Sequence, residues 1–231
     1  MRRFWDRRAR EDAFYFVDNR LRFRDPDVDR FWKEGEVALD TMLAAAAKEV
    51  RPGESVVDIG CGIGRLTRPL AARASQVWAV EISAEMLELA RKYNAGLENI
   101  HWLLGDGDSL AGIADESVDG IVSLVVFQHI PDPEVVMSYV REMGRVLKAG
   151  GWAAFHVSND PSIHRAPGFA ARLRGALSQK HPSGQGDAAW VGSAVDLDEL
   201  RRVAAASGLE VDRTSGEGTQ FCVVGARRAA R

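Results

Sequence analysis

Three features that would narrow the function at once are scarce or missing in this 231-residue sequence. Its two cysteines, Cys61 and Cys222, lie far apart, so neither a disulfide framework nor a CxxC zinc or redox pair is present. The net charge of −3 gives no sign of a nucleic-acid partner. No apolar run approaches the ~20 residues of a membrane span, and the charged residues 1–8 are not followed by the apolar stretch of a secretory signal. We therefore expect a soluble, cytoplasmic protein without a membrane partner.

The first 50 residues are expected to form a helical cap on a main domain over residues 51–231. Six aromatic side chains fall within residues 1–30, together with nine arginines and seven acids, and so many rings need burial. Residues 36–50 carry apolar side chains at helical spacing and end at Pro52-Gly53. The aromatic side chains of this cap, Tyr15 and Trp32 among them, are candidates to cover a cofactor or to stack on a flat acceptor.

From Ser55 onward, short apolar runs alternate with amphipathic segments. The expected strands are residues 56–59, 77–80, 100–104, 118–126 and 152–157. The expected helices are residues 66–74, 84–93 and 134–147, the last with Asp132 as its N-cap and Gly150 just beyond its end. Such alternation predicts an α/β fold of three layers, with a parallel sheet covered by helices on both faces.

The last third of the chain departs from this alternation. Residues 158–193 contain prolines, glycines and a short helical piece at 169–177, which suits an insertion that covers the substrate. Four basic residues against two acids give residues 159–193 a charge of +2, which suits either an anionic acceptor or a solvated surface. Asp196 begins a capping box for a helix that Gly208 ends. Residues 209–214 and 219–225 then predict a β-hairpin at the edge of the sheet.

A glycine-rich loop follows the first buried strand and precedes a helix. Gly60, Gly62 and Gly64 let the backbone turn sharply and approach a ligand, with Cys61 between the first two. A dinucleotide would place its pyrophosphate here, but it prefers the spacing GxGxxG, whereas this loop has GxGxG. Asp58 just before the loop would disfavour a pyrophosphate and suits a ligand that carries an ammonium and a sulfonium. The loop thus favours S-adenosylmethionine over a dinucleotide.

Further candidate ligands of the cofactor end the next two strands. Glu81 can accept two hydrogen bonds from a ribose diol, and Ile82 can pack on an adenine face. Asp106 can accept from the adenine amine, and Gly107 allows close backbone approach. Each residue alone has an ordinary explanation, such as turn chemistry for Asp106. Their joint order at consecutive strand ends, where open α/β sheets bind ligands, indicates an adenosine site.

Residues 52–157 resemble the class I S-adenosylmethionine-dependent methyltransferases, in the small-molecule group that includes enzymes of the ubiquinone and menaquinone pathways. The matching stretches are VVDIGCGIGRLT, VWAVEIS, LLGDGDSL, ESVDGIVSLVVFQHIPD and RVLKAGG. The resemblance implies a Rossmann-like seven-stranded sheet whose last strand is antiparallel. It also implies cofactor roles for the residues named above and for Leu124, whose backbone position commonly meets the methionine part.

Methyl transfer needs an aligned acceptor and, for a hydroxyl acceptor, a base. His129, after the fourth strand, is the candidate base; the alternative is that it only shapes the turn before Asp132. His156 is expected to be a core histidine, and His164 and His181 fall in the insertion. The scattered histidines lack metal-ligand spacing, so we expect no metal site.

We expect transfer to a small-molecule acceptor, with oxygen slightly favoured over nitrogen or carbon. Three alternatives stay open: a protein of this fold that binds the cofactor without transferring methyl, an RNA or protein methyltransferase, and a dinucleotide oxidoreductase. No nucleic-acid domain is visible, and residues 123–126 lack the Asn-Pro-Pro-Tyr type of motif that base-amine methylation uses. The cap and the insertion leave room for a homodimer.

Overall fold

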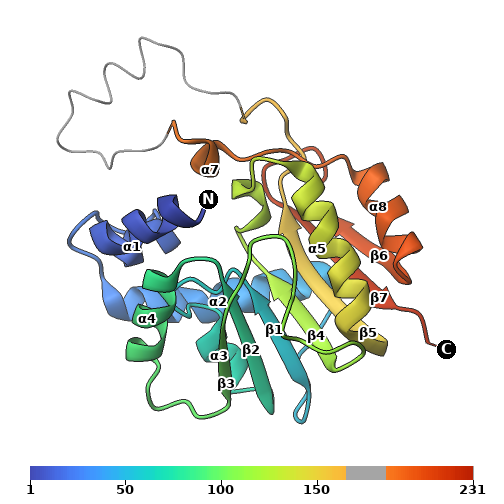
Figure 1. Ribbon diagram of the computed structural model, residues 1–231, viewed down its shortest axis with the longest axis horizontal. Helices are drawn as coiled ribbons and strands as arrows, with labels where there is room; N and C mark the ends of the chain where they lie inside the picture. The colour runs from blue at the N-terminus through green and yellow to red at the C-terminus, as the bar shows by residue number, and fades with distance from the viewer. Residues whose placement is uncertain (165–185, 231) are drawn as a thin grey trace.

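The computed structural model describes residues 1–164 and 186–230, which are built around one seven-stranded sheet (Figure 1). The sheet order is β3-β2-β1-β4-β5-β7-β6. The strands are β1 (Ser55–Ile59), β2 (Gln76–Glu81), β3 (Ile100–Leu104), β4 (Val118–Ser123), β5 (Leu147–Val157), β6 (Leu209–Ser215) and β7 (Cys222–Arg228). The first five strands pair in parallel, and β7 runs antiparallel between β5 and β6. The predicted fold class, including the antiparallel last strand and the terminal hairpin, is confirmed.

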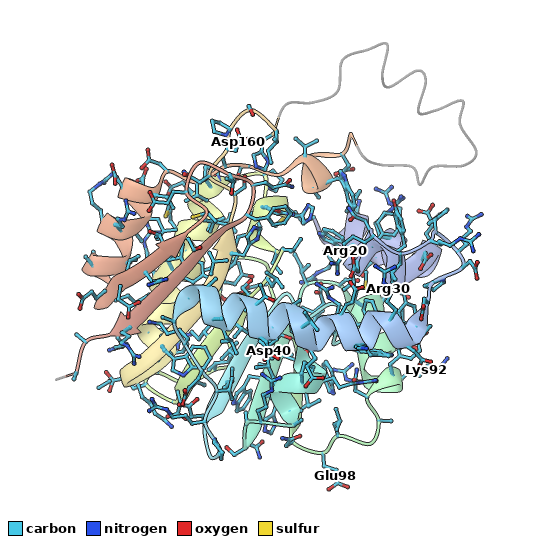
Figure 2. All side chains as sticks on the ribbon, turned by 180° about the vertical axis from the view of Figure 1, so that it is seen from behind. Arg20, Arg30, Asp40, Lys92, Glu98 and Asp160 are labelled. Atoms are coloured by element: carbon cyan, nitrogen blue, oxygen red, sulfur yellow. The ribbon has the colours of Figure 1, made fainter. Side chains whose placement is uncertain are left out.

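Helices cover both faces of the sheet. One face carries α5 (Pro133–Val146) and α8 (Leu197–Ala206), and a core of buried apolar side chains lies beneath them. The other face carries α2 (Val28–Ala46), α3 (Thr67–Ala71) and α4 (Ala84–Tyr93) over a second core. Figure 2 shows α2 running across the back of the sheet. This double cover explains why the central strands β1 and β4 are mostly apolar and mostly buried.

Local sequence signals set the helix ends on the first face. Asp132 caps α5 by accepting a hydrogen bond from the Glu134 amide at 3.0 Å. Asp196 caps α8 in the same way, as predicted. Helix α5 ends at Val146, four residues before Gly150, because Leu147 already adopts an extended conformation and pairs with β4. The expected C-terminal boundary was therefore one residue too late.

The two N-terminal helices occupy different places. Helix α1 (Arg2–Val17), kinked at Asp12, packs against α4 and shares a third apolar core with the start of α2. Arg2 donates to the backbone oxygens of Ile82 and Gly105, at 3.1 and 2.9 Å. Asp6 accepts from the Ser83 hydroxyl at 2.7 Å. Helix α1 is thus bonded to the loops that follow β2 and β3, whereas α2 is part of the helical layer on the sheet.

The segment after β5 returns to the sheet through a short helix. The helix expected at residues 169–177 lies outside the described residues. Helix α7 (Ala188–Val191), capped by Asp187, contacts η1 (Phe127–His129), the helical turn after β4. Gly192 has φ +63°, and a Cβ there would lie 1.6 Å from the Gln128 carbonyl oxygen, so only glycine fits this contact. Within the described ranges, no helix has the length and apolar character needed to cross a membrane.

Candidate functional site

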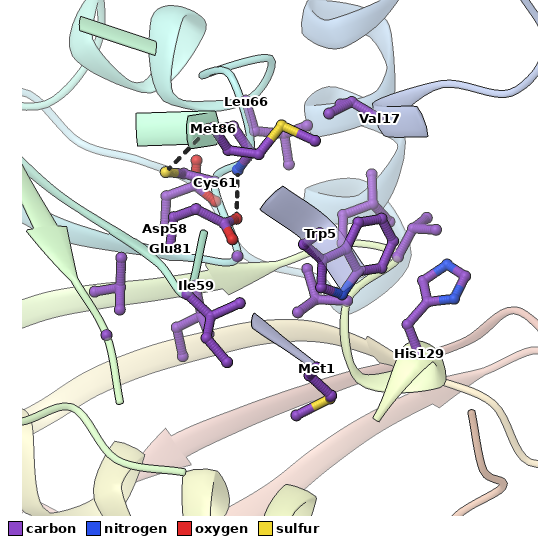
Figure 3. Close-up of a pocket in the computed structure, with 18 of the residues that line it drawn as sticks. Met1, Trp5, Val17, Asp58, Ile59, Cys61, Leu66, Glu81, Met86 and His129 are labelled. Carbon is purple, nitrogen blue, oxygen red and sulfur yellow. Dashed lines mark hydrogen bonds between the residues drawn. The ribbon is translucent and has the colours of Figure 1, made fainter. Parts of the chain in front are cut away.

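A pocket opens at the carboxyl ends of β1, β2 and β4, where an open α/β sheet binds ligands (Figure 3). Helix α1 covers it and contributes Trp5, Phe16 and Val17 to the lining, together with its N-cap residue Met1. Nine of the predicted site residues line this pocket: Asp58, Gly60, Cys61, Gly62, Glu81, Ile82, Gly107, Leu124 and His129. The structure therefore brings most of the predicted positions into one cavity.

The glycine loop forms the floor of the pocket. Its start is held by the amides of Gly60 and Cys61, which donate to the Val80 carbonyl at 2.8 and 3.1 Å. Gly60 and Gly62 have φ values of +73° and +55°, a region that favours glycine. A Cβ on Gly60 would lie 2.4 Å from the Val126 side chain. The loop is thus a backbone surface closely packed against its neighbours, with its peptide groups at the cavity.

Gly64, the third glycine, is not among the lining residues. It has φ +93°, and a Cβ there would lie 2.6 Å from the side-chain nitrogen of Asn94. That nitrogen donates to the Ile63 carbonyl at 3.1 Å. Gly64 therefore lets the loop pack against the end of α4 rather than facing the cavity.

Glu81 is a buried carboxylate at the end of β2. Its two oxygens accept from the Gly62 amide at 3.0 Å and from the Ser83 amide at 2.8 Å. Burial raises the pKa of Glu81, and these amide bonds oppose the rise. A carboxylate has about four acceptor sites, so two remain for hydroxyl donors from a ligand. The role of Glu81 toward a ribose diol stays a prediction, and these two acceptor sites are the ones it would use.

Asp58 lies beneath the glycine loop, 2% exposed, and accepts from the Thr67 hydroxyl at 2.6 Å. Burial raises the pKa of Asp58 to about 7, and the nearby charge of Glu81 adds to the rise. A ligand cation placed here would favour the ionised carboxylate. The site is therefore suited to a positively charged ligand group, as the sequence suggested.

The remaining adenosine candidates lie in the loops after β2 and β3, and not all of them line the pocket. Ile82 and Gly107 line the pocket and touch, since a Cβ on Gly107 would lie 2.7 Å from Ile82 Cδ1. Asp106 is exposed and is not among the lining residues. Its carboxylate accepts from the Ser109 amide at 3.0 Å and from the Ser109 hydroxyl, and these bonds lower the pKa of Asp106. In this conformation Asp106 is bound within its own turn.

Strand β4 ends at Ser123, three residues before the predicted end, because Val125 turns the chain. Val125 has φ +59°, which is strained for a β-branched residue. Its amide donates to His156 Nδ1 at 3.3 Å, and His156 Nε2 in turn donates to the Gln220 carbonyl at 2.9 Å. His156, 1% exposed, is thus a core residue whose ring holds this turn, and Leu124 and Val125 both line the pocket.

His129 lies beyond this turn and is fixed on two sides. Its Nδ1 donates to the Trp190 carbonyl at 3.1 Å, which leaves Nε2 as the unprotonated nitrogen, 3.3 Å from the Gln128 side-chain nitrogen. Burial lowers the pKa of His129 to about 4, so the ring is neutral at pH 7. The Trp5 ring meets it edge-on at 5.5 Å (Figure 3).

The other histidines and ring candidates fall elsewhere. His164 contacts the Val191 carbonyl at 2.5 Å and the Ser158 hydroxyl at 2.7 Å, and His181 lies outside the described residues. Trp32 stacks under the Arg68 guanidinium, 3.5 Å from its carbon. Neither Trp32 nor Tyr15 is among the residues that line the pocket.

Among the lining residues that sequence reasoning did not name as site residues, four are aromatic or charged: Trp5, Phe16, Arg65 and Tyr139. Trp5 and Phe16 belong to the aromatic N-terminal segment. The sequence shows that this segment is rich in rings, but it does not show which of them face the pocket. Arg65 directly follows the glycine loop, so its place in the sequence was a usable signal. Tyr139 lies on α5, where helical periodicity marks it only as a core position.

Comparison with known proteins agrees with this geometry. Residues 57–155 match the family described as a methyltransferase domain. A demethylmenaquinone methyltransferase of Tropheryma whipplei is 31% identical over 128 residues, 55% of this chain and 52% of that protein. A ubiquinone biosynthesis O-methyltransferase of Thiobacillus denitrificans is 28% identical over 168 residues, 71% of this chain and 68% of that protein. The matched part thus spans about half the length of the Tropheryma relative.

A solved structure shares the fold across the chain. Phosphoethanolamine N-methyltransferase 1 of Haemonchus contortus, in complex with phosphoethanolamine and S-adenosylhomocysteine, has a TM-score of 0.69 at 17% identity. The similarity covers 99% of this chain and 48% of that one.

The residues present in the pocket fit the S-adenosylmethionine group. Glu81 offers two free acceptor sites beside a glycine floor, and Asp58 provides an acidic position for the cationic end. Ile82 and Gly107 provide an apolar surface for a flat ring. Residues 57–155 of this chain thus carry a methyltransferase domain, and the sheet topology and the pocket residues fit S-adenosylmethionine as the cofactor.

Proposed function

We propose that this chain transfers the cofactor's methyl group to a hydroxyl oxygen of a small, flat, largely apolar acceptor. The observation that carries the proposal is the fixed, neutral imidazole of His129 beside aromatic rings. Its ring lies 5.5 Å from Trp5 and 5.4 Å from Trp190, measured between centroids, and Phe16 lies 5.8 Å from Trp190. Trp5, Phe16 and His129 line the pocket, and Trp190 packs behind them, so a planar acceptor that enters beside His129 would meet an apolar, aromatic wall.

The cofactor, when bound, supplies a methyl group on a sulfonium sulfur and is already activated for displacement. The protein's work is to align the acceptor and to receive its proton. The hydrogen bond to the Trp190 carbonyl sets the tautomer of His129, so the lone pair lies on Nε2. His129 Nε2, which in this structure accepts from the Gln128 side-chain nitrogen at 3.3 Å, would exchange that contact for the acceptor hydroxyl, take its proton during transfer and later release it to solvent.

Two kinds of support bear on the acceptor. The ubiquinone biosynthesis relative is named as an O-methyltransferase, and the demethylmenaquinone relative acts on a quinone-type molecule by its name. In this chain the acceptor end of the pocket combines apolar rings with one histidine, which suits a phenol or quinol better than a free phosphate.

The test is transfer of labelled methyl from S-adenosylmethionine to matched acceptors: a catechol, its dimethyl ether and phosphoethanolamine. We expect label in the catechol alone. His129→Ala should slow this transfer by about 10²–10⁴-fold and leave S-adenosylhomocysteine affinity unchanged. His101→Ala is the matched control, because His101 is exposed and stacks on Trp78. Label in the amine or in total RNA, or a His129→Ala rate within about threefold of the wild type, would refute the proposal.

A further inference from the structure

Arg65 is a cation in the wall of the cofactor pocket that the roles described so far do not use. It directly follows Gly64 and is 7% exposed. Among the described residues that line the cavity, it is the only arginine or lysine. A guanidinium is rarely buried without a strong reason, because desolvation of its charge is costly. Its burial here therefore calls for a partner or a ligand.

The protein partner of Arg65 is Asp18, at the C-cap of α1. Arg65 Nη1 lies 2.7 Å from Asp18 Oδ2, and both side chains are less than a tenth exposed. Asp18 is shared, since its two oxygens also accept from Arg20 at 2.8 and 2.5 Å. Within the part of the chain that the structure describes, the printed hydrogen bonds of the Arg65 side chain end at Asp18, and a guanidinium has five N–H groups. Donors are left over on the cavity side.

A glycine in the middle of α2 makes room for this arginine. A Cβ on Gly35 would lie 2.5 Å from the Arg65 carbonyl oxygen and 2.7 Å from Arg65 Cγ. Glycine is unfavourable inside a helix, so its presence at this contact serves close approach. Three separate segments therefore meet to position one guanidinium: the end of α1, the middle of α2 and the residue after the glycine loop.

We propose that Arg65 binds the α-carboxylate of the cofactor's methionine part, with Asp18 and Gly35 holding its guanidinium in position. The pocket also contains two acids, Asp58 and Glu81, which would repel a carboxylate. For a ligand with an ammonium, a sulfonium and a carboxylate, Arg65 thus marks the place in the pocket that suits the carboxylate. Arginine suits that group because its planar N–H groups match a carboxylate. The proposal rests on the cofactor and not on the acceptor or the reaction proposed above.

The test compares two ligands that differ only in this carboxylate: S-adenosylmethionine and decarboxylated S-adenosylmethionine. Calorimetric titration should show that Arg65→Gln weakens binding of the first by about 10- to 150-fold, the range for a hydrogen bond to a charged group. Binding of the decarboxylated ligand should change by less than about threefold. An equal loss for both ligands, or no loss for either, would overturn the assignment. No acceptor is present, so failure of the methyl-transfer proposal would leave this result unaffected.

Two further variants keep the test decisive if Arg65→Gln, which leaves Asp18 with Arg20 alone, folds poorly. The double variant Asp18→Asn/Arg65→Gln removes both charges and should show the same loss of preference for the carboxylate. Gly35→Ala keeps the arginine but displaces it, and it should reduce that preference in part. Arg68→Gln, an arginine that bonds instead to Asn94 and the Tyr93 carbonyl, should leave the preference unchanged.

Discussion

Replacing Glu81 tests the cofactor site most directly. In the free protein its oxygens accept from the amides of Gly62 and Ser83, at 3.0 and 2.8 Å. The two remaining acceptor sites are those we assign to a ribose diol. Hydrogen bonds to a charged group contribute about 1.5–3 kcal/mol each. Glu81→Ala removes both and should weaken S-adenosylhomocysteine binding by roughly 3–6 kcal/mol, about 10²–10⁴-fold.

Glu81→Gln replaces one carboxylate oxygen by an NH2 group, so it removes one ligand contact together with one of the two amide bonds to the loop. The amide keeps one acceptor oxygen, so the expected loss is about 10- to 150-fold, close to that of one bond. Isothermal titration with S-adenosylhomocysteine and with its 2′-deoxyadenosine analogue measures both effects. The wild type should discriminate between the two ligands, and Glu81→Ala should not.

The matched control is Glu85→Gln, four residues later, whose carboxylate pairs with Arg10 at 2.6 Å on the surface of α4. It should bind both ligands as the wild type does. If Glu81→Ala binds S-adenosylhomocysteine within about threefold of the wild type, Glu81 does not meet the ribose. If the variant loses affinity but still prefers the ribose hydroxyl, Glu81 acts only by holding the glycine loop.

Three further predictions concern pH. The pKa of Asp58 is raised to about 7, mainly by burial, and the ammonium of a bound ligand favours its ionised form, so S-adenosylhomocysteine affinity should fall about tenfold per pH unit below 7; constant affinity from pH 5.5 to 8, measured by calorimetry, would contradict this. Burial lowers the pKa of His129 to about 4, so kcat/KM for the acceptor, measured at saturating S-adenosylmethionine, should be flat from pH 5.5 to 7.5 and fall only near pH 4; an acid limb at pH 6–7 would show that the imidazole is not held neutral. Burial likewise lowers the pKa of His156 to about 4 from 6.5, so this residue's share of the free energy of unfolding is full above pH 6.5 and is lost by about 3 kcal/mol as pH falls to 4. Urea titrations of wild type and His156→Gln should differ in that slope, and equal slopes would show that another group controls it.

The fold was predictable because its signals are local. The parallel strands contain short apolar runs, α2, α5 and α8 each begin next to a capping aspartate, and the glycine loop requires residues that tolerate positive φ. The number of strands and the antiparallel last strand came from the family resemblance, whereas the strand order came from the structure. The end of β4 was wrong because Val125 is held in a left-handed conformation by His156, 31 residues away. No pattern around residues 118–126 records that contact.

The two halves of the site also differ in how far local sequence predicts them. The cofactor half uses strand ends and their loops, so consecutive positions such as Asp58 and the glycines mark it in the sequence. The acceptor half is assembled by distant segments: α1 provides Trp5, and α7 provides the carbonyl of Trp190 that fixes His129. An aromatic residue in an amphipathic helix has the same sequence pattern whether it faces a core or a cavity. Family resemblance therefore identifies the methyl donor, whereas the acceptor has to be argued from which rings surround His129.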